Sequence, residues 1–509
     1  MYVQSYSIKS SSFFIRRRHI RHLTPRRWSR SCLLPDVKSE SEKVETMSQR
    51  TNSLDLIQGL QDIETPHGVH LAGIYKRSFA FVTIRDRLPV ILTKIVDTLS
   101  REKDEIIKQY GQESAEEVKH IIGRISKLKN EVVTNKPLQR LPSVDIDDDK
   151  NVWNEYLDER TRIEGEIPCW FNTHWLYCEC YLYRRLAQEF ALTKTLKNYD
   201  PFRKQKQDSF TGSIGSIIAL SHYTMDLINR TENVSSAERK HEFIKLIKVD
   251  LWGNRCDLSL SAGAESNQSG NPISLLESLE KDILVDESKY IWDLLSKTDK
   301  QNNSLIVDII LDNAGYELFT DLCLAAFMVT HGLTQKVRFY VKSRPWYVSD
   351  TTVNDFHWLV EQMKTSSNPD LSALGEICAN HVQNNIFTIE EELFWTEPYD
   401  YAQMKSRDPI LYAKLSEATL AIFKGDLNYR KLTGDINFEY TTSFLESLRG
   451  FTPTNLLSLR TIKSDVCVGL PPGKAEAIRA KDENWLITGQ YGLIQATINS
   501  GCPCIQRTC

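Results

Sequence analysis

At 509 residues the chain is too long for one compact core, and its length predicts two or three domains. Its composition is that of an ordinary globular protein, with 41% hydrophobic and 26% charged residues and little glycine (22) or proline (17). A formal net charge of -4 excludes a general attraction to nucleic acid, and the chain lacks the apolar run of roughly 20 residues that a membrane span needs.

Residues 1–75 predict a basic N-terminal extension that we expect to be disordered. Arginines cluster between Arg16 and Arg30, serines are frequent, and no acidic residue precedes Asp36. This composition is typical of a mitochondrial presequence. The alternatives are a disordered extension or a wrongly chosen gene start. We expect a cytoplasmic protein, with a mitochondrial location as the alternative if the extension is a presequence.

Residues 76–246 predict an all-helical domain. Apolar residues recur at three- and four-residue steps along 88–99 and again along 118–128, so each segment has one apolar stripe. The stretch 170–190 is rich in aromatic residues, which at helical spacing indicate a core. The alternative is an exposed patch around Trp170, Trp175 and Tyr181, as in a non-catalytic interaction protein.

Residues 247–498 predict an α/β domain. Short apolar runs at 305–311, 336–341, 418–423 and 456–460 alternate with helical stretches. This alternation is typical of a mostly parallel sheet with helices on both faces, a three-layer α/β/α arrangement. Ligands of such sheets bind at the carboxyl ends of the strands. Residues 499–509 predict a disordered tail, with soft-metal binding by its cysteines (Cys502, Cys504, Cys509) as the alternative.

Polar residues follow the first two of these strands. Asp312 and Asn313 come directly after the first strand, and Gly315 permits a tight turn before the next helix. A carboxylate and an amide suit Mg²⁺ or Mn²⁺, and the start of a helix suits an anion. Asp350 follows the second strand after a short loop and could reach the same crevice. The alternative for all three polar residues is that they only cap helices.

The third and fourth strands end in basic and polar residues. These are Asp426, Asn428, Arg430 and Lys431 after Gly425, and Thr461 and Lys463. Arginine and lysine suit a phosphate, while the acid and amide suit hydroxyl groups or metal-bound water. The alternative is a charged surface turn. Since helix capping explains four polar strand ends poorly, the residues predict an oxygen-ligand metal site beside basic groups, which indicates phosphoryl chemistry.

The same segments resemble a known family. They are LDNAGYELFTDL at 311–322, PWYVSDTT at 345–352, FKGDLNYRKLTGD at 423–435 and RTIK at 460–463, with LWGNRCDLSLS at 251–261 and ECYLYRR at 179–185 as further matches. They are similar to the damage-control phosphatase family, in the subgroup also described as protein-glutamate O-methyltransferase (acidic residue methyltransferase). The likeness covers about residues 76–495.

The resemblance implies a metal-dependent phosphatase of reactive sugar phosphates such as fructose 1-phosphate and fructose 6-phosphate. It implies Mn²⁺ or Mg²⁺, with Co²⁺ and Ni²⁺ as further candidates, bound by three residues that also act in catalysis: Asp312, Asn313 and Asp350. It further implies a set of substrate-binding residues: Asp312, Asn313, Asp426, Leu427, Asn428, Tyr429, Arg430 and Lys463. The motif after the first strand lacks the second aspartate of haloacid-dehalogenase phosphatases, which favours attack by water over attack by Asp312.

The alternative function is an S-adenosylmethionine-dependent protein-glutamate O-methyltransferase, with Glu317 and Asp350 at that cofactor. A nucleotide-like cofactor in a Rossmann fold usually needs a glycine-rich first turn, and here that turn has only Gly315. The residues therefore favour the phosphatase, whose activity should vanish with a chelator. We expect no nucleic-acid or membrane partner, and the sequence carries no signal for the oligomeric state.

Overall fold

The computed structural model describes residues 57, 59–142, 149–231, 234–253, 272–298 and 305–498, which belong to one compact unit, Ser53–Cys509. The basic residues before 57 and the tail at 499–509 lie outside the described residues, and so does most of the stretch 251–261. Within the described ranges, no helix is both long enough and apolar enough to cross a membrane.

The segment 59–78 is part of the fold, so the expectation of a disordered extension up to residue 75 is wrong for these residues. Leu71 is fully buried. Its backbone N–H donates to the carbonyl of Asp435 at 2.9 Å, and the N–H of Asn437 donates to the carbonyl of Val69 at 2.8 Å. A few buried side chains, among them Leu71, Ala72 and Tyr75, and several backbone hydrogen bonds hold the segment. The average composition of the segment is polar and does not reveal them.

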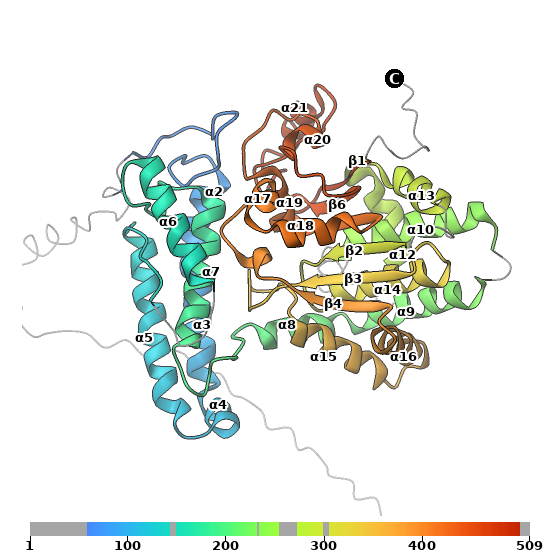
Figure 1. Ribbon diagram of the computed structural model, residues 1–509, viewed down its shortest axis with the longest axis horizontal. Coiled ribbons are helices and arrows are strands. Elements are labelled where there is room, and N and C mark those ends of the chain that lie inside the picture. Colours follow the sequence, from blue (N-terminus) through green and yellow to red (C-terminus); the bar gives the residue numbers. More distant parts are fainter. Residues whose placement is uncertain are drawn as a thin grey trace, which may run out of the picture. The chain divides into compact units, whose positions relative to one another are not determined.

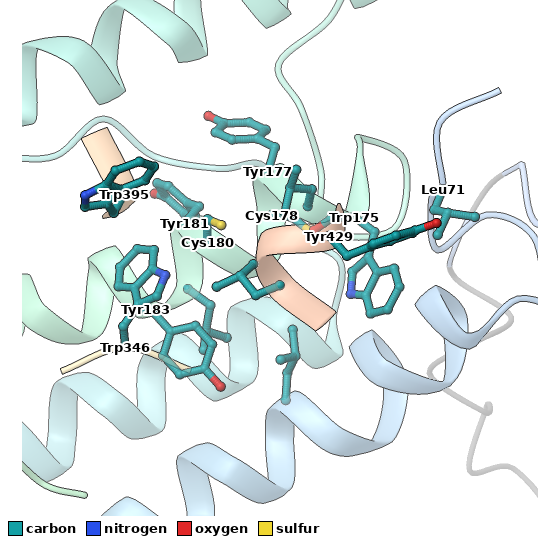
Figure 2. Close-up of a cluster of buried hydrophobic side chains, with 14 of the residues drawn as sticks. Leu71, Trp175, Tyr177, Cys178, Cys180, Tyr181, Tyr183, Trp346, Trp395 and Tyr429 are labelled. Atoms are coloured by element: carbon teal, nitrogen blue, oxygen red, sulfur yellow. The ribbon is translucent and has the colours of Figure 1, made fainter. Parts of the chain in front are cut away.

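The first part of the described chain is helical, as expected (Figure 1). Its elements are α2 (Phe79–Val82), the π-helical turn η3 (Thr83–Arg87), α3 (Leu88–Arg101), α4 (Lys103–Tyr110), α5 (Ser114–Val133), α6 (Lys150–Glu164) and α7 (Trp175–Ala191). We call α2–α7 the helical region. The aromatic residues of 170–190 are core residues, since Trp170, Trp175 and Tyr181 are at most 2% exposed, and Figure 2 shows several of them along α7. The alternative of an exposed aromatic patch is therefore wrong.

Within the described part, seven strands form one sheet. They are β1 (Ile283–Asp286), β2 (Ile306–Ile310), β3 (Lys336–Val341), β4 (Phe387–Glu391), β5 (Leu420–Lys424), β6 (Leu456–Thr461) and β7 (Gly492–Thr497). Their order is β1-β7-β6-β5-β2-β3-β4, and every neighbouring pair is parallel except β6 and β7. The expected mostly parallel sheet is confirmed. The four expected strands are the adjacent strands β6, β5, β2 and β3.

Helices cover both faces of the sheet, which confirms the three-layer arrangement. One face carries α8 (Arg203–Gly212), α9 (Ile214–Asn229), α10 (Ser236–Leu251), α12 (Pro272–Leu279), α13 (Ser288–Lys297), α14 (Tyr316–Thr330), α15 (Val353–Lys364) and α16 (Pro369–Gln383). The other carries α17 (Met404–Arg407), α18 (Pro409–Ser416), α19 (Gly425–Thr433), α20 (Phe444–Ser447) and α21 (Lys474–Arg479), and shares its core with the helical region. Successive strand residues alternate between the two cores: Ile422 of β5 belongs to the first and Phe423 to the second.

The boundary between the helical region and the α/β part lies before α8 rather than at residue 246. The apolar residues of α8, α9 and α10 belong to the core on the sheet face that α14 also covers. The sequence assigns these helices to the helical domain because apolar periodicity shows that a helix has a buried face. It does not show against which element that face packs.

The chain changes direction in the sheet between β2 and β5. From β2 it proceeds outward to β3 and β4, and it then returns to β5 and β6 on the other side of β2. The helix after β2, α14, covers one face, whereas the helix after β5, α19, covers the other. Such a switch point leaves a crevice at the carboxyl ends of the two strands, which is where ligands of open α/β sheets bind.

Candidate active site

Asp312 and Gly425 meet in the crevice between β2 and β5. Gly425 has a φ of +80°, and a Cβ atom at this position would lie 1.9 Å from Oδ2 of Asp312. Only glycine allows so close an approach. The helix α19 begins at Gly425, and no described side chain caps it. The crevice therefore combines a carboxylate with the N–H groups at the start of a helix, which attract anions.

Three neighbours orient the side chain of Asn313. Its Nδ2 donates to Oδ2 of Asp312 at 2.8 Å and to Oε2 of Glu317 at 2.7 Å, and its Oδ1 accepts from the hydroxyl of Ser349 at 2.5 Å. The amide is thus held from both ends, with its oxygen toward the loop that contains Asp350.

Asp350 lies in the same cluster. Its backbone forms a β-bridge with Asn313, and the N–H of Thr351 donates to the carbonyl of Asp312 at 2.8 Å. The buried ammonium of Lys342 lies 3.2 Å from Oδ2 of Asp350 and donates to the carbonyl of Leu311 at 2.8 Å. Lys342 was not among the expected site residues, and its only signal in the sequence is its place at the end of β3.

Negative charge accumulates in this cluster. Burial raises the pKa of Asp312 well above its ordinary value, and the carboxylates of Glu317 and Asp350 add to the rise, whereas Lys342 and Lys463 oppose it. Burial also raises the pKa of Asp350 to about 6 against the effect of Lys342. A bound divalent cation would remove this conflict, because it favours the ionised carboxylates.

The donor set fits a hard cation. Carboxylate and amide oxygens are ligands that Mg²⁺ and Mn²⁺ prefer, and Asp312, Asn313 and Asp350 offer both kinds within one cluster. In the part of the chain that the structure covers, no three His, Cys, Asp or Glu side chains form a complete metal-binding group. The amide oxygen of Asn313 and water would therefore have to contribute ligands.

A buried lysine, Lys424, neutralises a group of carboxylates next to the cluster. The ammonium of Lys424 donates to Oδ1 of Asp250 at 2.5 Å and to Oδ1 of Asp321 at 2.8 Å, and it lies 3.7 Å from Oε1 of Glu317. It thereby ties the end of β5 to α10 and α14. Sequence reasoning missed Lys424, whose only signal is a charge at the end of an apolar strand.

Two residues of the RTIK motif at 460–463, Arg460 and Lys463, have different roles. Arg460 is buried, and its Nε donates to Oδ1 of Asp426 at 2.7 Å. Burial opposes ionisation of Asp426, but Arg460 and Arg430 hold its pKa below the ordinary value. The same Oδ1 accepts from the backbone N–H of Lys463 at 3.2 Å, whereas the Lys463 side chain is half-buried and acts electrostatically on Asp312. Arg460 thus fixes the loop, and Lys463 faces the charged cluster.

Arg430, an expected phosphate ligand, is paired inside the protein. Its Nη1 donates to Oε2 of Glu179 at 2.6 Å, its Nε and Nη2 donate to Asp435 at 2.8 Å, and its guanidinium lies 3.5 Å from the ring centroid of Trp175. It joins α19 to α7 of the helical region. In this arrangement Arg430 has a structural role.

The other expected residues of α19 also point into the protein. Asn428 donates to the carbonyl of Lys424 at 2.7 Å, Tyr429 donates to Oε1 of Gln495 at 2.9 Å, and Leu427 is in the core. Lys431 donates to the carbonyls of Glu397 and Trp395. What α19 offers to the crevice is therefore its first backbone N–H groups rather than these side chains.

Of two cavities in the described residues, one reaches the edge of this cluster. It has a volume of about 850 Å³ and is lined by the end of α7, residues 197–203, residues 342–345 after β3 and the start of α15, so that it includes Lys342. The other, of about 320 Å³, lies between the segment 64–82 and the loop that follows α21. Neither is lined by Asp312, Asn313 or Asp350. The convergence of charges, rather than cavity size, therefore marks the candidate site.

The family described as "Damage-control phosphatase ARMT1-like domain" matches residues 83–478. The protein named "Damage-control phosphatase ARMT1" from Danio rerio is 42% identical over 431 residues, which cover 84% of this chain and 96% of the relative. The protein of the same name from Homo sapiens is also 42% identical over 431 residues, with 84% and 97% covered. A crystal structure of a DUF89 family protein from Pyrococcus horikoshii is similar to this chain over 69% of its length and 91% of that chain, with 16% sequence identity and a TM-score of 0.34.

Proposed function

The chain belongs to the damage-control phosphatase ARMT1-like family, and on this premise we propose that it is a metal-dependent phosphatase of small phosphorylated sugars, fructose 1-phosphate and fructose 6-phosphate among them. The observation that carries the proposal is the approach of Asp312 to Gly425. It supports the proposal because a carboxylate suited to a hard cation and N–H groups suited to a phosphate share one crevice.

Asp312, Asn313 and Asp350 would hold the cation, Mn²⁺ or Mg²⁺ in the first place and Co²⁺ or Ni²⁺ as further candidates. When bound, the ion would offset negative charge on the phosphoryl group and make water more acidic. Glu317 and Ser349 hold the amide of Asn313 in one orientation, and Lys342 pairs with Asp350. Such fixed partners reduce the reorganisation that binding a cation requires.

The phosphate of the substrate would be bound by the first N–H groups of α19 and by the ammonium of Lys463. Asp426 keeps these two elements together, since it lies in the first turn of α19 and accepts hydrogen bonds from Lys463 and Arg460. Among the expected substrate residues, we therefore assign Asp426 and Arg430 to positioning rather than to direct contact with the phosphate.

We propose water as the group that attacks phosphorus. Oδ2 of Asp312 accepts a hydrogen bond from Asn313 and lies against Gly425, so this oxygen is already engaged. The methyltransferase alternative gains no separate support: Glu317 and Asp350, its expected cofactor residues, contact Asn313 and Lys342.

Chelation tests the proposal. Phosphate release from fructose 1-phosphate by the full chain should cease after treatment with EDTA and return when Mn²⁺ is added. Turnover that persists in EDTA at full rate would contradict a metal-dependent mechanism.

A further inference from the structure

The loop that carries Asp350 contains a strained turn. Tyr347 and Val348 are two successive non-glycine residues with positive φ, 41° and 72°. A β-branched residue such as Val348 is a rare outlier in this region. Such a conformation persists only where the surrounding structure holds it, and it is found preferentially at functional sites.

The turn leads directly into the candidate site. Ser349, the next residue, donates to Oδ1 of Asn313, and Asp350 follows it. Two backbone hydrogen bonds close the turn: the N–H of Ser349 donates to the carbonyl of Tyr347 at 2.9 Å, and the N–H of Asp350 donates to the carbonyl of Trp346 at 3.1 Å. The direction in which Ser349 and Asp350 point thus depends on the conformation of residues 346–348.

Helix α7 of the helical region holds this turn. The ring of Tyr347 stacks on Tyr183 with centroids 4.7 Å apart and planes at 24°. Its hydroxyl donates to Oε2 of Glu179 at 3.2 Å. Trp346 is fully buried with its ring 5.8 Å from that of Tyr183, and Figure 2 shows these two side chains beside each other. Glu179 and Tyr183 belong to the ECYLYRR stretch at 179–185, which supplies none of the proposed metal or phosphate contacts.

Glu179 links both sides of the crevice. Its Oε2 also accepts from Nη1 of Arg430 at 2.6 Å. One carboxylate of the helical region therefore contacts the loop after β3, through Tyr347, and the helix after β5, through Arg430. The contact with Arg430 is buried and the contact with Tyr347 is partly buried, and a hydrogen bond to a charged group is strong where water is excluded.

We propose that Tyr347 is a positioning residue: Glu179 and Tyr183 of α7 clamp it, and it thereby holds the strained turn so that Ser349 orients Asn313 and Asp350 is set for metal binding. The helical region then contributes to the metal site although it supplies none of the ligands. The inference rests on the proposed function for the presence of a metal ion at Asp312, Asn313 and Asp350.

Mn²⁺ binding to the metal-free full chain, measured by the electron paramagnetic resonance signal of free Mn²⁺, tests the clamp without depending on activity. Tyr347→Ala should weaken binding by about tenfold or more, the range found when partners of metal ligands are removed. Tyr347→Phe keeps the stacked ring and loses only the hydroxyl, so it should weaken binding by a smaller factor. If Tyr347→Ala does not fold, the comparison of Tyr347→Phe with the wild type tests the clamp.

Tyr181→Phe is the matched control. Tyr181 lies on the same helix and is buried, but its hydroxyl donates to the carbonyl of Gln139 and accepts from Arg185, away from the turn. It should bind Mn²⁺ as the wild type does, even if its melting temperature falls. Wild-type affinity in both Tyr347 variants overturns the clamp, and so does an equal loss in Tyr181→Phe. If the wild-type chain itself binds no Mn²⁺, the metal site of the proposed function is overturned, and the clamp with it. If the wild type binds Mn²⁺ and the Tyr347 variants bind it equally well, only the clamp is overturned.

Discussion

Alanine at position 425 would disturb the crevice at its narrowest point. Its Cβ would lie 1.9 Å from Oδ2 and 2.2 Å from Cγ of Asp312, whereas ordinary van der Waals contact begins at 3.4 Å. The carboxylate of Asp312 would have to move away by about 1.5 Å, because atoms this close repel steeply. That movement would also break the hydrogen bond that Asp312 accepts from Asn313.

The displacement sets the size of the expected effect. A shift of about 1 Å in a catalytic group costs on the order of 100-fold in rate. The φ of +80° adds a backbone cost of roughly 1–2 kcal/mol for a residue with a Cβ atom, which is less than the roughly 5–15 kcal/mol that stabilises a typical domain. We therefore expect Gly425→Ala to fold and to lose about two orders of magnitude in kcat.

The assay is phosphate release from a sugar phosphate in the presence of Mn²⁺, together with thermal unfolding of the same preparations. Gly434→Ala is the control, since Gly434 ends the same helix with a φ of +67° and the atoms nearest to its added Cβ belong to the Arg449 guanidinium, at 2.3 Å, rather than to Asp312. That variant should pay a similar backbone cost and keep its turnover. Wild-type turnover in Gly425→Ala would refute the reasoning, because the crevice would then not be the place of catalysis.

Three further predictions concern buried ionisable groups. Lys424→Met leaves the carboxylates of its cluster without their cation, and urea denaturation should show a loss of about 3–5 kcal/mol; wild-type stability would contradict the described contacts. Arg430→Met should lose a similar amount of stability because the buried carboxylates of Glu179 and Asp435 lose their cation; if Arg430 only bound phosphate, its removal would instead raise KM and leave stability unchanged. Burial, with smaller effects of His70 and Arg160, lowers the pKa of His174 to about 2, so the unfolded chain takes up a proton below about pH 6.5 that the folded chain does not. The free energy of unfolding should therefore fall as the pH drops from 6.5, by up to about 1.4 kcal/mol per pH unit, and His174→Gln should remove this contribution in urea titrations; an unchanged pH dependence in the variant would contradict it.

Much of the sheet could be predicted from the sequence because its central strands are buried on both faces. β5 is fully buried along Leu420–Lys424, and such strands read as continuous apolar runs. The edge strand β4, Phe387–Glu391, ends in two glutamates and shows no such run. β7 contains the polar residue Gln495, whose burial is tolerated because its side chain accepts a hydrogen bond from Tyr429. Hydropathy cannot reveal a strand whose polar residue is satisfied by a partner far away in the sequence.

The candidate site was predictable to the extent that it depends on strand ends. Asp312 and Asn313 lie just beyond the end of β2, after Leu311, and parallel strands bring such residues to one edge. Arg430 shows the limit: its residue type suits a phosphate, but its partner Glu179 lies 251 residues away, so only the tertiary structure shows that the guanidinium is occupied. Lys424 was missed for the same reason, since its carboxylate partners Asp250 and Asp321 come from α10 and α14. Lys342 pairs with Asp350 of the same loop, but only the folded loop brings the two side chains together.

We propose that the crevice at Asp312 is the site of a metal-dependent phosphatase. The most direct test is phosphate release from a panel of sugar phosphates with Mn²⁺, Mg²⁺, Co²⁺, Ni²⁺ or EDTA, for the wild type, Asp312→Ala and the control Asp370→Ala, whose aspartate is a partly exposed residue of α16 paired with His222. We predict metal-dependent turnover by the wild type and by Asp370→Ala, and none by Asp312→Ala or in EDTA. Turnover that survives Asp312→Ala would contradict the account. So would silence across the panel with intact binding of S-adenosylmethionine, which would favour the methyltransferase instead.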